Sequence, residues 1–329
     1  MKTAEALAAA ACRPLLATLS PGGTRARLSI FIFHRVLPAP DPMRPDEPDA
    51  ERFAWQMALV ASLFRVLPLS AAVRRLRAGT LPARAACITF DDGYSDNHAI
   101  ALPILRRLGL TATFFVATGF LNGGRMFNDT VIEVLRQAPA GTLDLSAAGL
   151  GRHELHSLAD RRTAVQAILQ RMKYGSLEQR ERWLDGMVTA VEAALPTDLM
   201  MSDEQVADLA AQGMEVGAHT VNHPMLTRES RTRVHEELTE SREVLRELTG
   251  RDVAAFAYPN GRLGDDFVDA HRELVAELGF DTAVSTHPGV GTRRTDPFLL
   301  PRFTPWDRSV PRFAARSARN LQTTPFVRD

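Results

Sequence analysis

The chain has 329 residues, of which 45% are hydrophobic and 24% charged, as is typical of a globular protein that builds its own core. Its 39 basic and 39 acidic side chains give a formal net charge of zero, which argues against a nucleic-acid-binding surface. No run of about 18 apolar residues occurs, so no transmembrane helix is expected. The two cysteines, Cys12 and Cys87, do not make a disulfide framework.

Residues 1–27 are expected to form a separate N-terminal helical segment. The alanine-rich stretch between Lys2 and Cys12 could be read as a signal sequence, but it is short, and Arg13 and Pro14 follow it at once. We therefore expect a short amphipathic helix, and a cytoplasmic location rather than export.

Strand and helix patterns then alternate twice along the chain, over residues 28–120 and again over residues 200–305. The expected strands are residues 28–33, 86–90, 111–117, 214–218, 254–258 and 280–285. The expected helices include residues 51–64, 96–108 and 231–249. This order is typical of parallel βαβ units, so we expect an α/β barrel.

Two further segments lie outside this pattern. Residues 121–199 are charged, helical in their spacing and poor in strand signals, which predicts an α-helical insertion. Residues 306–329 are expected to form a C-terminal tail.

Polar residues follow several of the predicted strands directly. Asp91 and Asp92 come after the strand that ends at Phe90, His219 follows Ala218, and Tyr258 ends another strand. In barrels of parallel strands, active sites are built at this rim. We therefore expect these side chains to meet in one site.

The adjacent carboxylates Asp91 and Asp92 repel each other, and a bound cation would relieve the repulsion. The alternative is an ordinary Asp-Gly turn with Gly93. His219 and His223 are four residues apart, so on one helical turn they could grip one metal together with Asp92. A chance pair among nine histidines is the alternative. Zinc, cobalt, manganese or iron would suit such ligands.

The strings Thr-Phe-Asp-Asp-Gly-Tyr (89–94) and His-Thr-Val-Asn-His-Pro (219–224) resemble the motifs of the polysaccharide deacetylase family, which has the NodB-homology domain and is also called carbohydrate esterase family 4. The resemblance implies a deformed (β/α) barrel that removes acetyl groups from glycans. It implies Asp91 as general base, and Asp92, His219 and His223 as ligands of one divalent metal. Zinc is expected first, with cobalt, manganese, iron and nickel as alternatives. It also implies that the backbone N–H of Tyr258 helps to hold the oxyanion.

Two departures from the family pattern affect the remaining roles. The arginine that most members carry shortly before the tyrosine is absent, and Arg302 is a candidate substitute for orienting Asp91, or else a structural arginine. The string Ile32 to Val36 resembles the branch that acts on poly-N-acetylglucosamine, whose acid histidine lies early in the chain. This implies His34 as general acid. His287, or a purely structural His34, are the alternatives.

The expected function is hydrolysis of N-acetyl groups on a polysaccharide or oligosaccharide containing N-acetylhexosamine, with release of acetate. An O-acetyl ester or a small amide is an alternative substrate. An inactive glycan-binding protein is a further alternative, as is a scaffold built on residues 121–199. The expected partner is an acetylated glycan; the sequence predicts no particular protein partner.

Overall fold

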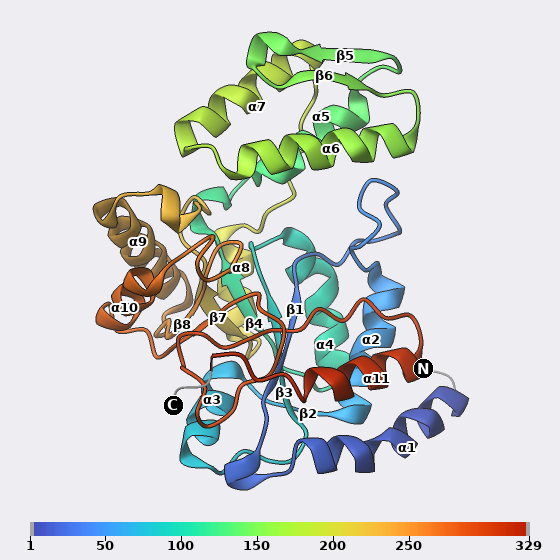
Figure 1. Cartoon of the computed structure of the whole chain (residues 1–329), viewed down its shortest axis with the longest axis vertical. Helices are drawn as coiled ribbons and strands as arrows, with labels where there is room; N and C mark the ends of the chain where they lie inside the picture. The colour runs from blue at the N-terminus through green and yellow to red at the C-terminus, as the bar shows by residue number, and fades with distance from the viewer. Residues whose placement is uncertain (1–2, 327–329) are drawn as a thin grey trace.

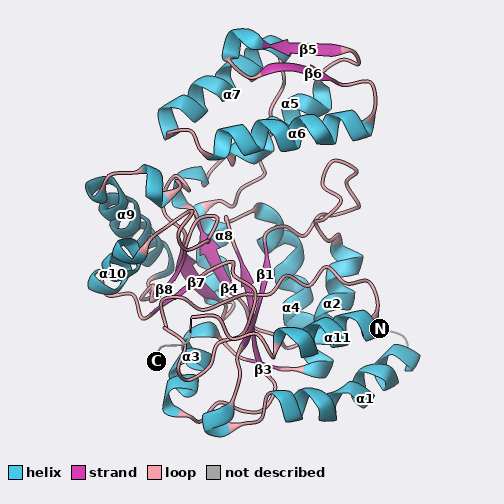
Figure 2. Cartoon of the chain, viewed as in Figure 1, coloured by secondary structure: helices cyan, strands magenta, loops and turns pink. Residues whose placement is uncertain are grey.

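A curved, parallel seven-stranded sheet forms the centre of the computed structural model, which describes residues 3–326 (Figures 1 and 2). Its main path runs β1(Ser29–Phe33), β3(Ala85–Phe90), β4(Thr113–Val116), β7(Glu215–Ala218), β8(Ala255–Ala257), β9(Thr282–Val284), and the short β2(Arg65–Val66) pairs with β3. Every residue of β1 and β3 is buried, as expected of strands covered on both faces. The predicted parallel α/β fold is confirmed.

The barrel is closed by an irregular segment rather than by an eighth regular strand. Leu300 forms a parallel bridge with Val284 of β9, and Phe303 forms one with Phe31 of β1. The Leu300 N–H donates to the Ala283 carbonyl, and the Leu300 carbonyl accepts the N–H of Ser285. The segment 300–303 therefore joins the two edges of the sheet, and the residue between these bridges, Arg302, is brought to the barrel interior.

Helices pack around this sheet (Figure 2). They are α2(Ala50–Leu63), α3(Leu69–Ala78), α4(Leu102–Arg107), α8(Asp203–Ala211), α9(Arg231–Thr249) and α10(Asp269–Glu277). Helix α9 has the predicted bounds. Ser230 caps its first turn, Gly250 ends it in a left-handed conformation, and the apolar stripe that includes Val234 and Leu238 is buried.

The two terminal segments lie against each other. Helix α1(Thr3–Leu19) contacts α2 and α11(Val310–Asn320). The prediction of a C-terminal tail over 306–329 is therefore wrong for residues 310–320, which form a helix. Its Phe313 is buried and stacks on Phe31 of β1, with ring centroids 5.9 Å apart. Within residues 3–326, no helix combines the length and the apolarity needed to span a bilayer.

Residues 121–199 form a separate lobe above the barrel (Figure 1). It contains α5(Phe127–Gln137), α6(Leu158–Lys173), α7(Leu177–Val191) and an antiparallel hairpin of β5(Thr142–Leu145) and β6(Gly151–Glu154). Its own hydrophobic cluster includes Val131, Ile168 and Met187. The lobe is mainly helical as predicted, but the hairpin was not predicted, because its strands are only four residues long and largely exposed, and β6 shows no apolar alternation.

Candidate active site

The Asp91–Asp92 pair lies at the carboxyl end of β3, at the predicted rim. The Asp91 N–H donates to the Phe33 carbonyl of β1 (3.0 Å), and Asp92 adopts a left-handed conformation with φ 78°. Gly93 follows at φ 94°, and a Cβ there would lie 2.9 Å from Val116 Cγ1. The tight turn therefore needs glycine at 93, and it aims two adjacent carboxylates into the barrel mouth.

Arg302 holds Asp91 in a fixed orientation. Its Nη1 and Nη2 donate to Oδ1 and Oδ2 of Asp91, each at 2.7 Å, while Nε donates to the Ser285 carbonyl at 2.9 Å. Both side chains are almost fully buried. The predicted contact is present, and it depends on the closing segment 300–303, which pairs with β1 and carries the guanidinium to the end of β3.

This ion pair controls the charge state of Asp91. Burial alone would raise the pKa of Asp91, but the Arg302 guanidinium, with His219 and His34 nearby, brings that pKa below its ordinary value. Because this pKa is lowered in the folded state, ionised Asp91 stabilises the fold. That contribution is fully present above the unfolded-state pKa of about 3.9 and is lost as pH falls through the folded-state pKa.

We predict that Arg302→Met lowers the free energy of unfolding by about 3–5 kcal/mol at pH 7, because Asp91 is left buried without its counter-charge. The pKa of Asp91 should then rise, and the acidic limb of the kcat/KM profile should move to higher pH. Urea unfolding at pH 7 and at pH 4 measures the first effect, which should be smaller at pH 4. A loss below 1 kcal/mol with an unmoved acidic limb would contradict this role.

The second motif is not the helical turn that its spacing predicted. His219 and His223 lie on a loop after β7, with Thr220 and His223 in left-handed conformations at φ 65° and 49°. The buried Glu237 of α9 accepts the N–H groups of Val221 and Asn222, both at 2.8 Å. The loop keeps the two imidazoles together because Glu237 satisfies backbone groups that a helix would have satisfied internally. The sequence did not predict this role for Glu237, because nothing in the pattern of α9 distinguishes it from the other glutamates of that helix.

Asp92, His219 and His223 converge as predicted. One ligand atom from each lies within 4.8 Å of the others, and all three residues are buried. Asp92 Oδ1 is 3.4 Å from His219 Nε2 and 3.6 Å from His223 Nε2. His219 Nδ1 lies 2.7 Å from the Ala257 carbonyl, so as a donor there it leaves the Nε2 lone pair facing Asp92.

The electrostatics of this trio fit a cation. Burial and the positive charge of His219 lower the pKa of His223 to about 3, so its imidazole is neutral at pH 7. Burial opposes ionisation of Asp92, but the histidines lower its pKa below the ordinary value. Among residues 3–326, the two histidines are the ion-pair partners of Asp92. Burial opposes protonation of His219, but its contact with Asp92 and the charge of Asp91 raise the pKa of His219 above its ordinary value. An ionised, buried carboxylate beside two imidazoles is a suitable donor set for a divalent metal, because the cation can take the place of the proton on His219.

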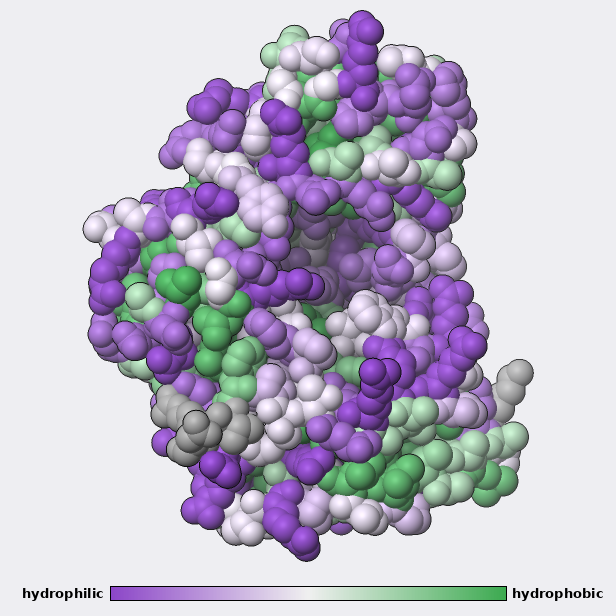
Figure 3. Space-filling model, viewed as in Figure 1, coloured by the Kyte–Doolittle hydropathy of each residue, from purple (hydrophilic) through white to green (hydrophobic). Residues whose placement is uncertain are grey.

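His34 lies next to these residues, in the loop after β1. A cavity of about 360 Å³ is lined by His34 and Asp92 from the barrel and by Asn128, Ile132 and Gln166 from the insertion. Figure 3 shows the surface hollowed between the two lobes, with hydrophilic residues around the opening. His34 is also among the groups that lower the pKa of both Asp91 and Asp92.

The predicted oxyanion role of Tyr258 is wrong for this structure. Its N–H donates to the Val284 carbonyl of β9 (3.2 Å), and its hydroxyl donates to the Phe298 carbonyl (3.1 Å). The hydrogen bonding between β8 and β9 thus uses the backbone N–H of Tyr258, and Pro259 has no backbone N–H. The first backbone N–H after the strand without an acceptor among the described residues belongs to Asn260.

His287, the alternative acid, lies elsewhere. Its ring packs edge-on against Phe326 (4.8 Å), and the charged groups that act on it are Arg262, Asp265 and Asp266. Burial lowers the pKa of His287. The imidazole is not among the groups that act on Asp91 or Asp92, although the His287 carbonyl accepts the N–H of Arg302 at 3.0 Å.

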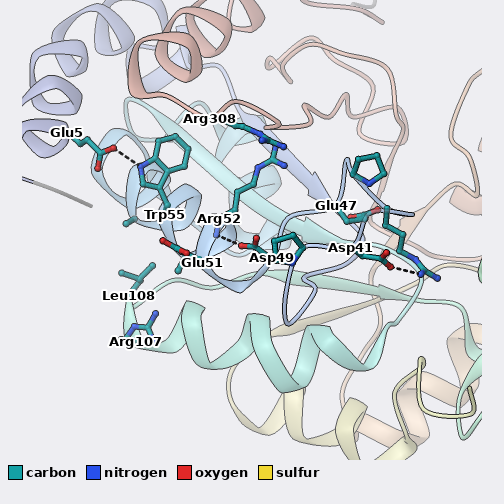
Figure 4. Close-up of a pocket in the computed structure, with 15 residues that line it drawn as sticks. Glu5, Asp41, Glu47, Asp49, Glu51, Arg52, Trp55, Arg107, Leu108 and Arg308 are labelled. Atoms are coloured by element: carbon teal, nitrogen blue, oxygen red, sulfur yellow. Dashed lines mark hydrogen bonds and ion pairs between the residues drawn. The ribbon is translucent and has the colours of Figure 1, made fainter. Parts of the chain in front are cut away.

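A second cavity of about 940 Å³ lies between α1, α2 and the loop 40–49 (Figure 4). Its lining includes Glu5, Arg52, Trp55 and Arg308. None of the predicted catalytic or metal-binding residues lines it, so its size does not make it the active site.

A two-histidine, one-carboxylate cluster at the rim of a parallel barrel, beside a second ionised carboxylate, is the arrangement of a catalytic metal centre. The family model for polysaccharide deacetylase matches residues 78–283, and the chain belongs to this family.

Individual relatives are distant. YxkH of Bacillus subtilis (strain 168), named for the same family, is 19% identical over 219 residues, which are 67% of this chain and 50% of that protein. The chain thus spans about half the length of this curated relative.

Solved structures share the fold. The Streptococcus pyogenes deacetylase PplD, in complex with acetate, has a TM-score of 0.58 at 19% identity, covering 90% of this chain and 98% of that one. IcaB from Ammonifex degensii has a TM-score of 0.59 at 20% identity, covering 91% and 98%. A de-N-acetylase from Aggregatibacter actinomycetemcomitans has a TM-score of 0.52 at 14% identity, covering 87% and 99%.

Proposed function

We propose that this protein is a metal-dependent deacetylase that removes N-acetyl groups from a glycan containing N-acetylhexosamine and releases acetate. The observation that carries the proposal is the placement of Asp91. Arg302 holds its carboxylate in one orientation, and it lies next to the Asp92–His219–His223 cluster at the barrel mouth. A protein that only bound glycans would not need this ionised second carboxylate.

Amide hydrolysis needs an activated water, a stabilised oxyanion and a protonated leaving nitrogen. A divalent cation held by Asp92, His219 and His223, zinc being the first expectation, would supply Lewis-acid chemistry by polarising the acetyl carbonyl and making water a stronger acid. Asp91 is ionised and accepts the proton of the attacking water. The Asn260 N–H is the candidate backbone donor to the oxyanion, in place of Tyr258.

His34 supplies the last requirement. When the C–N bond breaks, the amine nitrogen takes a proton from the His34 imidazole, and acetate and a free amine leave. An alkoxide or aryloxide leaving group needs this proton less than an amine does. A histidine beside the two aspartates therefore favours the N-acetyl substrate over an O-acetyl ester.

Acetate release tests the proposal directly. Purified protein is loaded with zinc, cobalt, manganese, iron or nickel in turn and incubated with N-acetylglucosamine oligomers, with acetylated xylan as the ester comparison. We expect acetate and new free amines from the oligomers, and less acetate from xylan. Turnover of xylan with intact oligomers would replace the proposal with an O-acetyl esterase, and sugar binding without acetate would replace it with a glycan-binding protein.

We predict that His34→Ala lowers kcat on N-acetylglucosamine oligomers by roughly 10²–10³-fold, because the amine would leave without a positioned acid. Hydrolysis of 4-nitrophenyl acetate should fall by less than about threefold, since nitrophenolate leaves unprotonated. The matched control is His156→Ala, which removes an exposed histidine of the insertion. Equal losses on both substrates would show that His34 is not the acid.

A further inference from the structure

The backbone around His34 is held by two buried side chains from the segment that follows Asp92. Asn97 Nδ2 donates to the His34 carbonyl at 2.8 Å. Asp96 Oδ1 accepts the N–H of Val36 at 3.0 Å, and its Oδ2 accepts Nε of Arg35 at 2.8 Å. The segment that carries the metal ligand Asp92 therefore also fixes the residues on both sides of the candidate acid.

Arg35 continues this chain of contacts into the insertion. Its guanidinium lies over the Tyr94 ring, 4.6 Å from the centroid, and its Nη1 is 3.8 Å from Asp129 Oδ1 on α5. Asp129 is completely buried and also accepts Nη2 of Arg44 at 2.8 Å. A continuous set of charged contacts thus leads from α5 through Arg35 to the backbone at His34.

The charged groups in this set depend on one another. Arg35 and Arg44 both face Asp129, Arg35 also pairs with Asp96, and all four are buried. Arg44 pairs in addition with Asp41 and Glu133. Removing one member of such a set leaves the remaining charges uncompensated in a medium of low dielectric, so they must rearrange. Because Arg35 is adjacent to His34 in the chain, we expect a rearrangement of Arg35 to shift the His34 backbone and, with it, the imidazole.

We propose that Asp129, supplied by the insertion, is a positioning residue for the general acid and acts on His34 through Arg35 and Asp96. The inference rests on the proposed function of His34. It gives the insertion a part in the reaction beyond forming one wall of the cavity.

The insertion has a second anchor that provides a matched control. Lys173, at the end of α6, lies 3.0 Å from the buried Asp266 of the barrel. This contact joins the same two lobes but has no contact with Arg35, Asp96 or His34. Lys173→Ala leaves the buried Asp266 without its counter-charge and so loosens this anchor, but it keeps the four charges around the acid in place.

The test is a double-mutant cycle with Asp129→Asn, His34→Ala and the double variant, with Lys173→Ala as control. Acetate release from N-acetylglucosamine oligomers and hydrolysis of 4-nitrophenyl acetate are measured on zinc-loaded protein. We expect Asp129→Asn to lower kcat on the oligomers about 10-fold at nearly unchanged KM, and the aryl ester rate by less than about twofold. The double variant should match His34→Ala alone, and any loss in Lys173→Ala should be equal on the two substrates, because Lys173 does not act on the acid.

The inference is overturned if Asp129 and His34 act independently, so that the rate losses of the two single variants multiply in the double variant. It is also overturned if Asp129→Asn slows hydrolysis of both substrates equally. If Asp129→Asn does not fold, Arg35→Lys enters the same cycle, because it keeps the charge but loses the planar fork that reaches Asp96 and Asp129 together. Wild-type protein that releases no acetate from the oligomers would instead overturn the proposed function, which separates the two failures.

Discussion

Asp91→Asn is expected to lower kcat on N-acetylglucosamine oligomers by about 10²–10⁴-fold while the protein still binds its metal. The carboxamide keeps the size of the side chain but cannot accept a proton from water. Arg302 holds both oxygens of Asp91 at 2.7 Å, so no other carboxylate can take that position without moving the closing segment. The measurement is steady-state acetate release at pH 7 together with metal content.

Two controls separate loss of the base from loss of the fold. Asp144→Asn removes an exposed carboxylate that pairs with Arg152 in the insertion hairpin, and it should leave turnover unchanged. Thermal unfolding of Asp91→Asn shows how far the unpaired Arg302 destabilises the barrel. Turnover within about threefold of wild type, in a folded and metal-loaded Asp91→Asn variant, would remove Asp91 from the mechanism.

His219→Ala is expected to abolish specific metal binding and to lower activity by roughly 10³-fold or more, which corresponds to ~4 kcal/mol of transition-state stabilisation. His219 is 1% exposed and is oriented by the Ala257 carbonyl, which fixes its Nε2 in one place; a water in the space left by alanine would not be fixed in this way. Chelation of the wild-type protein should have the same effect and should be reversed by added metal.

The matched control is His235→Ala, on α9, which removes an exposed histidine outside the site. It should bind metal and turn over like wild type. Full activity of the chelated protein, or full metal content in His219→Ala, would show that the three residues do not form the metal site.

The sequence predicted the fold and the main site residues wherever several local patterns, such as a helix cap, an apolar stripe or a strand end, agreed with one another. Helix α9 has a capping serine, an apolar stripe and a terminal glycine, and its bounds were predicted correctly. The Asp91–Asp92 pair and the two histidines each follow a buried strand, and parallel strands bring such ends to one rim. Arg302 was named as a candidate partner of Asp91, and the contact is present.

Other features depend on long-range contacts that local patterns do not encode. The loop from His219 to His223 is held by Glu237 rather than by helical hydrogen bonds, so its i,i+4 spacing suggested the wrong conformation. The N–H of Tyr258 is used by the β8–β9 ladder, whose register a single strand pattern cannot show. Helix α11 begins at Val310 and has Pro311 in its first turn, and it is stabilised by packing of Phe313 on β1. The tail prediction did not anticipate this long-range contact.

Anomalous diffraction from a zinc-loaded crystal tests the central claim most directly. We predict one strong zinc peak at full occupancy, about 2.0–2.2 Å from a carboxylate oxygen of Asp92 and from Nε2 of both His219 and His223, with Asp91 beside the metal but still paired with Arg302. Zinc bound at other residues only, or a zinc-loaded structure in which these three side chains point away from one another, would contradict the account.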